Sequence, residues 1–274
     1  MTKSITVAAL DGIPPIYIPY RSQIFMLAKS GKLQGKTLNI IGLSASLRSD
    51  MWILFQRYYT DISQAQFATD LEAKSKVILL IDSGDKSVQG FSTIEIYKRK
   101  IAGKAVHAIY SGDTIIASDY WGQSALQIAF AKLLGKQFLL NRLQPIHWFL
   151  ISKGYKTYLL FSRNLLNYYP RHDQSTPVWE EAVIDTLSRE KFGDNWQAHK
   201  GVLQFINPAG RLLEGVAPIE QSLIDDYPDI RFFVEKNPGH QQGDELCCIG
   251  RIDKSTFLYF ISRTLRKTRR MLKS

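Results

Sequence analysis

The sequence has few cysteines and no long apolar segment. Cys247 and Cys248 are the only cysteines among its 274 residues, and they are adjacent in an apolar run. Because successive side chains of a strand point to opposite faces, this pair predicts neither a disulfide framework nor a zinc site. No window reaches the roughly 18 uncharged apolar residues of a membrane span, and the proline-containing start of the chain does not resemble a signal peptide. We therefore expect a cytoplasmic protein.

Acidic residues are outnumbered, and the common catalytic motifs are missing. The chain has 25 Asp and Glu residues against 35 Lys and Arg, which gives a formal net charge of +10 and a pI near 9.5. This excess predicts attraction to an anionic partner, such as a nucleic acid, a membrane surface, a phosphorylated cofactor or an acidic protein. The sequence contains no Walker loop, dinucleotide fingerprint or Ser-His-Asp nucleophile elbow, so we do not expect those sites.

Apolar residues make up 45% of the chain, enough to bury the core of one large or two small domains. Their spacing predicts two helices, three strands of an antiparallel meander, and then a helix, a strand and a helix. In this order, the predicted elements cover residues 51–60, 63–74, 74–83, 88–103, 104–118, 124–140, 145–152 and 157–169. Ser49 or Asp50 can cap the first helix and Ser63 the second, and Gly112-Asp113 predicts a bulge in the third strand.

A polar stretch at 170–177 separates these elements from the remainder of the chain. Beyond it, the pattern predicts a helix over 177–193, several short strands and a terminal helix. The short strands are predicted at residues 201–206, 219–228, 230–239 and 245–252. We therefore expect an irregular β-rich lead-in over 1–46, a core over 47–170, and a C-terminal α+β extension over 171–274 that forms a subdomain or a lid.

The predicted terminal helix is strongly basic. Its cations are Arg263, Arg266, Lys267, Arg269, Arg270 and Lys273. They are explained by a solvated helix end, where cations suit the negative end of the helix dipole. The less favoured alternative is a docking surface for an acidic partner or a lipid.

The most specific local pattern lies where the third predicted strand meets the next helix. Residues 117–135 read ASDYWGQSALQIAFAKLLG, an apolar run followed by a turn with Gly122 and then by a helical pattern. A strand that enters a helix through such a turn leaves main-chain N–H groups directed outward from the helix N-terminus. These groups favour an anion, commonly a phosphate.

The order of elements over residues 47–169 resembles the GNAT acyltransferase superfamily. The resemblance implies an α+β fold with a mixed, mainly antiparallel sheet flanked by helices. In that family the turn carries an Arg/Gln-x-x-Gly-x-Gly/Ala signature that holds the pyrophosphate of coenzyme A; here Gly122 and a small residue, Ser124, are kept, and Asp119 replaces the cation or amide. The donor-binding residues that the resemblance implies are Ile115, Ile116, Ala117, Tyr120, Trp121, Gly122, Gln123, Ser124 and Ala125.

Asp119 bears on the identity of the donor, because a carboxylate repels a pyrophosphate. Members of the superfamily similar to N-acyl amino acid synthases and autoinducer synthases take acyl chains from acyl carrier protein, which is acidic and would suit a basic enzyme. The resemblance thus implies no permanently bound cofactor, and either acyl-CoA or acyl-phosphopantetheine as co-substrate. At the family's usual acid position stands Leu150, so that Ser152, Tyr155 or Tyr158 substitutes, or the thiolate leaves unaided.

Amide formation from a thioester needs a neutral amine, and therefore a base or a water relay. The candidates on the meander are Asp113, His107 and Glu95, and each is also explained by an ordinary turn or strand role. Asp113 is nearest to the predicted phosphate turn. His147, on the strand after the predicted phosphate-binding helix, is a candidate for lining the cleft that would hold the acyl group or the acceptor. The polar loop 237–246 is a candidate for holding the acceptor amine.

Our preferred interpretation is an N-acyltransferase that passes an acyl group, with a fatty acyl chain as the favoured case, from acyl carrier protein or CoA directly to an amine. Direct attack fits the absence of a convincing covalent nucleophile. The acceptor can be an amino acid, a polyamine or a peptide Lys or ornithine, and we expect no nucleic-acid partner. The alternative is a non-catalytic GNAT-like module that binds an acidic protein, a membrane or a nucleic acid through its basic surface.

Overall fold

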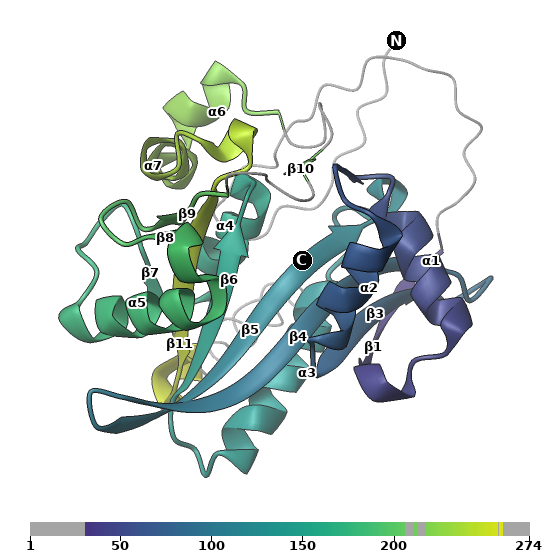
Figure 1. The fold of residues 1–274 in the computed structure, drawn as a ribbon, viewed down its shortest axis with the longest axis horizontal. Helices are drawn as coiled ribbons and strands as arrows, with labels where there is room; N and C mark the ends of the chain where they lie inside the picture. The colour runs from purple at the N-terminus through teal and green to yellow at the C-terminus, as the bar shows by residue number, and fades with distance from the viewer. Residues whose placement is uncertain (1–30, 206–210, 213–217, 257, 260–274) are drawn as a thin grey trace, which may run out of the picture.

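A computed structural model describes residues 31–205, 211–212, 218–256 and 258–259 of the chain. Its main feature is a twisted mixed sheet with the strand order β1-β3-β4-β5-β6-β11-β9-β8, in which β7 also pairs with β11 (Figure 1). The strands are β1 (Leu33–Asn39), β3 (Lys76–Asp82), β4 (Val88–Ile101), β5 (Lys104–Ile116), β6 (Ile146–Ser152), β7 (Tyr168–Tyr169), β8 (Trp196–Gln197), β9 (Val202–Leu203) and β11 (Glu245–Ile252). Of the described pairs in this sheet, β5 and β6 are parallel and the others antiparallel.

The predicted meander is present as β3, β4 and β5. The bulge predicted at Gly112-Asp113 is also confirmed, because Ser92 pairs with Thr114 while Ile94 pairs with Ser111. One β4 residue therefore lies opposite two β5 residues. Such a bulge bends the strand and redirects its side chains.

The helices cover both faces of the sheet. They are α1 (Ala45–Phe55), α2 (Gln64–Glu72), α3 (Ala125–Leu140), α4 (Tyr155–Asn164), α5 (Val178–Phe192), α6 (Gln221–Asp226) and α7 (Pro228–Lys236). The predicted cap of α2 is confirmed, since the Ser63 hydroxyl accepts a hydrogen bond from the N–H of Gln66 at 3.1 Å. The predicted cap of α1 is wrong: the helix begins six residues earlier, where Ser44 accepts from the N–H of Leu47.

Aromatic contacts assign the helices to the two faces. On one face, Trp148 of β6 stacks on Phe130 of α3, with centroids 4.6 Å apart, and also contacts Phe161 of α4. On the other face, α5 packs on β5 and β6, and α1 and α2 lie over β3 and β4 (Figure 1). The predicted fold class, a mainly antiparallel mixed sheet flanked by helices, is confirmed.

The sheet takes strands from all three predicted segments. β1 lies within the predicted lead-in and forms an edge of the sheet, and β11 of the predicted extension pairs with β6 along seven residue pairs. The extension thus shares the sheet instead of forming a separate subdomain. Cys247 and Cys248 of β11 are buried in two different apolar clusters, as expected for opposite faces of a strand.

Two predicted strands of the extension are wrong. Residues 219–228 and 230–239 contain the helices α6 and α7, because Pro228 begins α7 and the helix buries Ile230 and Phe233 one turn apart. The short strand β10 (Arg211–Leu212) instead pairs with β2 (Tyr59–Thr60) in a small ribbon. The lead-in up to residue 30 and the basic segment 260–274 lie outside the described residues.

Candidate active site

The central feature of the site is the place where two parallel strands separate. β5 and β6 pair from His107–Ile146 to Ser111–Leu150, and the pairing ends there. Beyond Ser111, β5 continues to Ile116 paired only with β4, whereas β6 remains paired with β11 along its whole length. In the described residues, the β6-facing edge of residues 112–116 therefore has no strand partner, and of its main-chain groups the carbonyl of Ile116 accepts a hydrogen bond from the Trp121 indole.

The divergent end of β5 leads directly into the predicted phosphate turn. A short 3-10 turn over Ser118–Tyr120 is followed by Gly122 at φ +88°, a left-handed conformation that glycine adopts without strain. α3 then begins at Ala125, and its capping residue Ser124 makes no side-chain capping hydrogen bond. The first-turn N–H groups of α3 consequently have no side-chain cap among the described residues, which is the geometry that favours an anion.

Two side chains of this turn hold it in place. The Tyr120 hydroxyl donates a 2.6 Å hydrogen bond to the buried carboxylate of Asp82, which lowers the pKa of Asp82 and raises that of Tyr120 to about 12. The Gln123 amide accepts from the N–H of Leu33 and donates to the carbonyl of Gly31. Tyr120 and Gln123 therefore fix the turn to the β1–β3 edge, and their side chains are occupied there.

The other predicted donor residues divide into buried and exposed groups. Ile115, Ala117 and Ala125 are buried in the core, and Ile116 is half-buried. Trp121, Gly122 and Ser124 are exposed on the turn. Asp119, which stands where the family has a cation or amide, is exposed as well.

A cation that the sequence pattern does not predict lies beside the turn. The ammonium of Lys156, in the first turn of α4, is 4.1 Å from the centroid of the Trp121 ring, and burial lowers its pKa. The Trp121 indole donates to the carbonyl of Ile116 at 2.8 Å, which fixes the ring position. The N-termini of α3 and α4 are thus joined through a Trp–Lys contact.

A cluster of charged side chains and tyrosines lies on the α2/α5 face next to the divergence. Lys191 of α5 pairs with Glu95 of β4, and Lys153 pairs with Glu245 at 3.4 Å. The ring of Tyr110 lies under both Lys191 and Lys74, at 4.6 and 5.8 Å from its centroid. We call this set the acceptor cluster: Tyr59, Lys74, Glu95, Tyr110, Asp113, Lys153, Lys191 and Glu245.

Burial shifts the pKa values of several side chains in the acceptor cluster in the direction that favours their uncharged forms. It raises the pKa of Asp113, against an opposing effect of Lys74 and Lys153, and it raises the pKa of Glu245. It lowers the pKa of Lys74, and the neighbouring Lys191 adds to this decrease. A carboxylate with a raised pKa holds a proton more strongly than an ordinary carboxylate and is therefore the stronger base.

The predicted catalytic residues do not all lie together. Asp113 and Glu95 belong to the acceptor cluster. His107 lies six residues before Asp113 on β5, about 20 Å along an extended strand. It is buried, and burial lowers its pKa against an opposing effect of the Asn141 side chain. Tyr155 is buried at the start of α4, where burial raises its pKa, and the charges that also influence it belong to Arg163 and Glu220.

The remaining candidates have structural surroundings. His147 is buried against Trp179, and burial lowers its pKa to about 4. The Ser152 hydroxyl donates to the carbonyl of Gly154, and the Tyr158 hydroxyl donates to that of Pro170. Leu150 is buried in the core.

The loop 237–246 contributes one side chain to the acceptor cluster. Asn237 is buried and donates to the carbonyl of Asp244 at 2.9 Å, so it stabilises the loop itself. Glu245 is the residue that reaches Lys153. In the described part of the chain, no three His, Cys, Asp or Glu side chains are grouped as a metal site.

Comparison of the sequence with protein families and with curated proteins finds no match. Among solved structures, a conserved Enterococcus faecalis protein described as a probable N-acyltransferase is 12% identical over 61% of this chain and 45% of its own, with a TM-score of 0.37. The Escherichia coli GNAT family N-acetyltransferase YhbS, solved with CoA, is 12% identical over 44% of this chain and 64% of its own, with a TM-score of 0.33. The chain thus spans less than two thirds of either protein. A Trypanosoma brucei acetyltransferase is 13% identical over 54% of this chain and 99% of its own, with a TM-score of 0.36.

Proposed function

We propose that this chain is an N-acyltransferase that moves an acyl group from a pantetheine thioester to an amine. The observation that carries the proposal is the divergence of β5 from β6, directly before an uncapped helix N-terminus. A pantetheine arm contains two amide groups, and an unpaired strand edge offers main-chain partners for both. The turn at Gly122 and the start of α3 would hold the phosphate at the end of that arm.

The donor side favours a pantetheine donor that carries a single phosphate over CoA, which carries a pyrophosphate. The exposed carboxylate of Asp119 opposes a second phosphate group, whereas Lys156 beside Trp121 supplies a cation from α4. A single phosphodiester, as on acyl carrier protein, carries less negative charge than the pyrophosphate of CoA and would be opposed less. We infer that acyl-phosphopantetheine is the favoured donor and acyl-CoA the alternative, with a fatty acyl group as the favoured cargo.

The acceptor amine would approach from the α2/α5 face, where the acceptor cluster lies. Its nitrogen attacks the thioester carbonyl, the C–N bond forms, and the C–S bond breaks to release a thiolate. The proton leaving nitrogen passes to the Asp113 carboxylate directly or through water, and the thiolate takes a proton from solvent. Main-chain N–H groups at the strand divergence would stabilise the oxyanion of the intermediate.

The acceptor cluster also supports a cationic acceptor. Glu95 and Glu245 are paired with Lys191 and Lys153, so Asp113 and the rings of Tyr59 and Tyr110 are the groups that the cluster would offer to an ammonium. An ammonium group is stabilised by such carboxylates and by aromatic faces. Amino acids, polyamines and peptide Lys or ornithine side chains all provide this group.

The test is to incubate the purified chain with acyl-CoAs or acyl-carrier protein and a panel of amines, and to search for a new amide by mass spectrometry. Asp113→Asn should lower kcat/KM by about 100-fold or more, the usual contribution of a general base, while donor binding is retained. Asp194→Asn, at a carboxylate of the turn after α5, is the matched control and should be active. Donor binding without turnover by any variant would instead favour a non-catalytic module, and absence of both would refute the proposal.

A further inference from the structure

A second surface lies at the C-terminal end of α3, away from the donor turn. Leu139 and Leu140 end the helix and Leu143 follows it, with exposed fractions of 69%, 65% and 43%. Exposed cations accompany these leucines on the same helix and its turn. We call the set the leucine-basic end: Lys132, Lys136, Leu139, Leu140, Arg142 and Leu143. Large apolar side chains clustered in water commonly mark an interaction surface.

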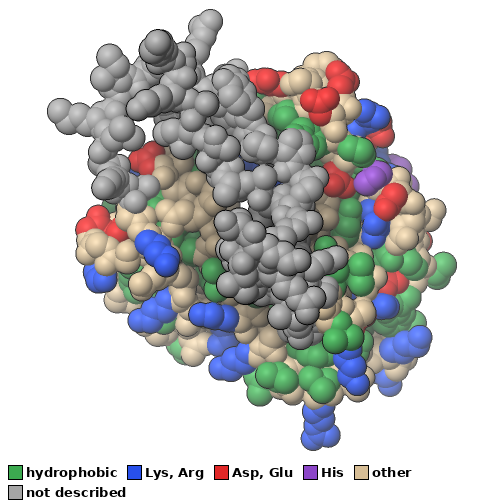
Figure 2. Space-filling model, turned by 180° about the vertical axis from the view of Figure 1, so that it is seen from behind, with side chains coloured by type: hydrophobic (Ala, Val, Ile, Leu, Met, Phe, Trp, Pro, Cys, Tyr) green, Lys and Arg blue, Asp and Glu red, His purple; other side chains and the backbone are tan. Residues whose placement is uncertain are grey.

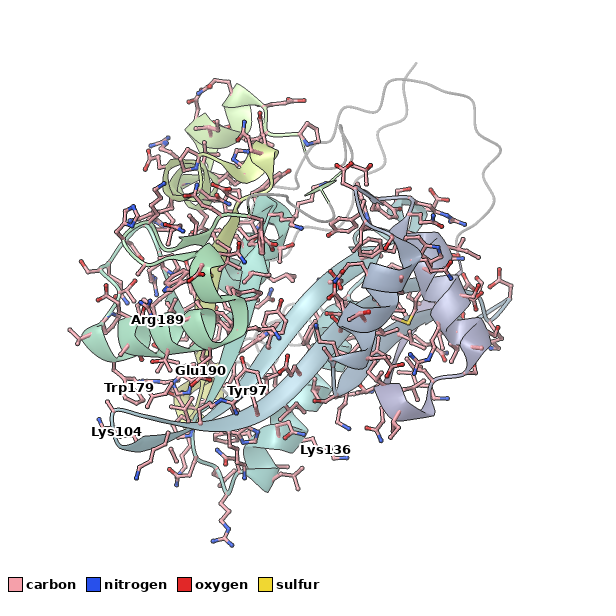
Figure 3. The ribbon with its side chains drawn as sticks, viewed as in Figure 1. Tyr97, Lys104, Lys136, Trp179, Arg189 and Glu190 are labelled. Carbon is pink, nitrogen blue, oxygen red and sulfur yellow. The ribbon has the colours of Figure 1, made fainter. Side chains whose placement is uncertain are left out.

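The residues on either side of this end in the sequence contribute no acidic side chains to balance its positive charge. Residues 120–172, which include α3, β6 and α4, contain no Asp or Glu. Figure 2 shows Lys and Arg side chains among hydrophobic ones along the lower margin of the molecule. In Figure 3, Lys104 of the β4–β5 hairpin and Lys136 of α3 both lie toward that margin.

The backbone at this end has a left-handed conformation at Leu143, whose side chain is exposed. Arg142 and Leu143 have φ values of +53° and +58°, in the left-handed region that non-glycine residues seldom adopt. The N–H of Leu143 bonds to the carbonyl of Phe138 at 3.0 Å, which closes the end of α3. Leu143 remains partly exposed, so its apolar side chain gains little burial from this arrangement.

We propose that the leucine-basic end docks on an anionic lipid surface, with the leucines inserted among the acyl chains and the cations at the headgroups. Exposed apolar side chains flanked by Lys and Arg fit this interface, and the absence of Asp and Glu from residues 120–172 lowers the repulsion that anionic headgroups would meet from this part of the chain. An acyl carrier protein fits less well, because it must deliver its arm to the start of α3. The 16 residues of α3 place that site about 24 Å from the leucines.

The test measures sedimentation of the full chain with vesicles. We expect binding to vesicles of equal parts phosphatidylcholine and phosphatidylglycerol, weak binding to phosphatidylcholine alone, and loss of binding at high salt. The triple variant Leu139→Gln, Leu140→Gln and Leu143→Gln should weaken binding at least about tenfold. Neutralising Lys136 and Arg142 should weaken it on the order of fivefold per cation.

Matched controls separate this surface from other sources of binding. Ile41→Gln and Val178→Gln remove apolar side chains that are 95% and 84% exposed elsewhere, and they should bind normally. Arg269→Gln with Arg270→Gln tests the basic terminal segment. Binding that depends on the terminal arginines and ignores the leucines would overturn the proposal. The proposal would also be overturned if light scattering showed that the leucine variants change only self-association, or only binding to acyl carrier protein.

Discussion

Asp113 owes its surroundings to one extra residue in β5. The bulge opposite Thr93 places Asp113 just past the last β5–β6 pair. There its pKa is raised by burial and lowered by Lys74, which follows α2, and by Lys153, which follows β6. Without the bulge, alternation would direct this side chain to the other face. The sequence predicts the bulge from Gly112-Asp113. It does not predict the lysines, because they come from segments far apart in the chain and each is ordinary in its own element.

The pH dependence of the reaction tests this arrangement. Burial raises the pKa of Asp113, so the acidic limb of kcat/KM should lie above the usual carboxyl range near ~4. Activity should fall as the pH drops through this raised value, because the base becomes protonated. Lys74 lowers the pKa of Asp113; Lys74→Gln should therefore move the limb to higher pH, while Lys98→Gln, at an exposed cation of β4, should leave it in place. An unmoved limb in Lys74→Gln would argue against Asp113 as the base.

Asp119 offers a test of donor choice. Its exposed carboxylate weakens pyrophosphate binding by a screened interaction, so Asp119→Asn should strengthen CoA binding by about twofold to fivefold. The same variant should bind an acyl-pantetheine without phosphates as the parent does. Isothermal titration calorimetry gives both affinities. Equal gains for the two ligands would mean that Asp119 acts through the fold of the turn instead of through charge.

At the scale of elements, the meander, α3 and β6 could be predicted because each has a distinct period and a clear end. α6 and α7 could not, because their short apolar runs fit a strand as well as a helix, and Pro228 reads equally as a strand end or a helix start. The start of α1 is ambiguous in the sequence because Ser44 and Ser49 are both suitable capping residues, and the structure uses Ser44. The divergence of β5 from β6 could not be predicted from local periodicity, because periodicity does not show which strands pair.

The turn before α3 can be tested as an element by a pair of glycine variants. Gly122 and Gly103 both have positive φ values, +88° and +79°, and neither has an atom within 4 Å of an added Cβ. Gly122→Val and Gly103→Val should therefore strain the backbone similarly, by about 1–2 kcal/mol. Only Gly122→Val should weaken donor binding, by about tenfold, because it alters the N–H groups at the start of α3. Comparable losses in both variants would show a general effect of destabilisation.

At the scale of the whole molecule, the two ends of α3 lie at two different proposed sites. The N-terminal end follows the turn after the strand divergence, and the C-terminal end presents the leucines. In the described residues, no helix is both long and apolar enough to cross a bilayer. Docking through the leucine-basic end would leave the α2/α5 face and the donor turn accessible.

The central claim is that residues 112–116 of β5 bind a pantetheine arm. The most direct measurement is a crystal structure of the chain with a non-hydrolysable acyl-pantetheine phosphate. We expect the amides of the arm to bond to the free edge of these residues, the phosphate to lie at the N–H groups after Gly122, and the acyl carbonyl to face Asp113. A structure in which β6 pairs along this edge through Ile116, or in which the ligand binds elsewhere, would contradict the account.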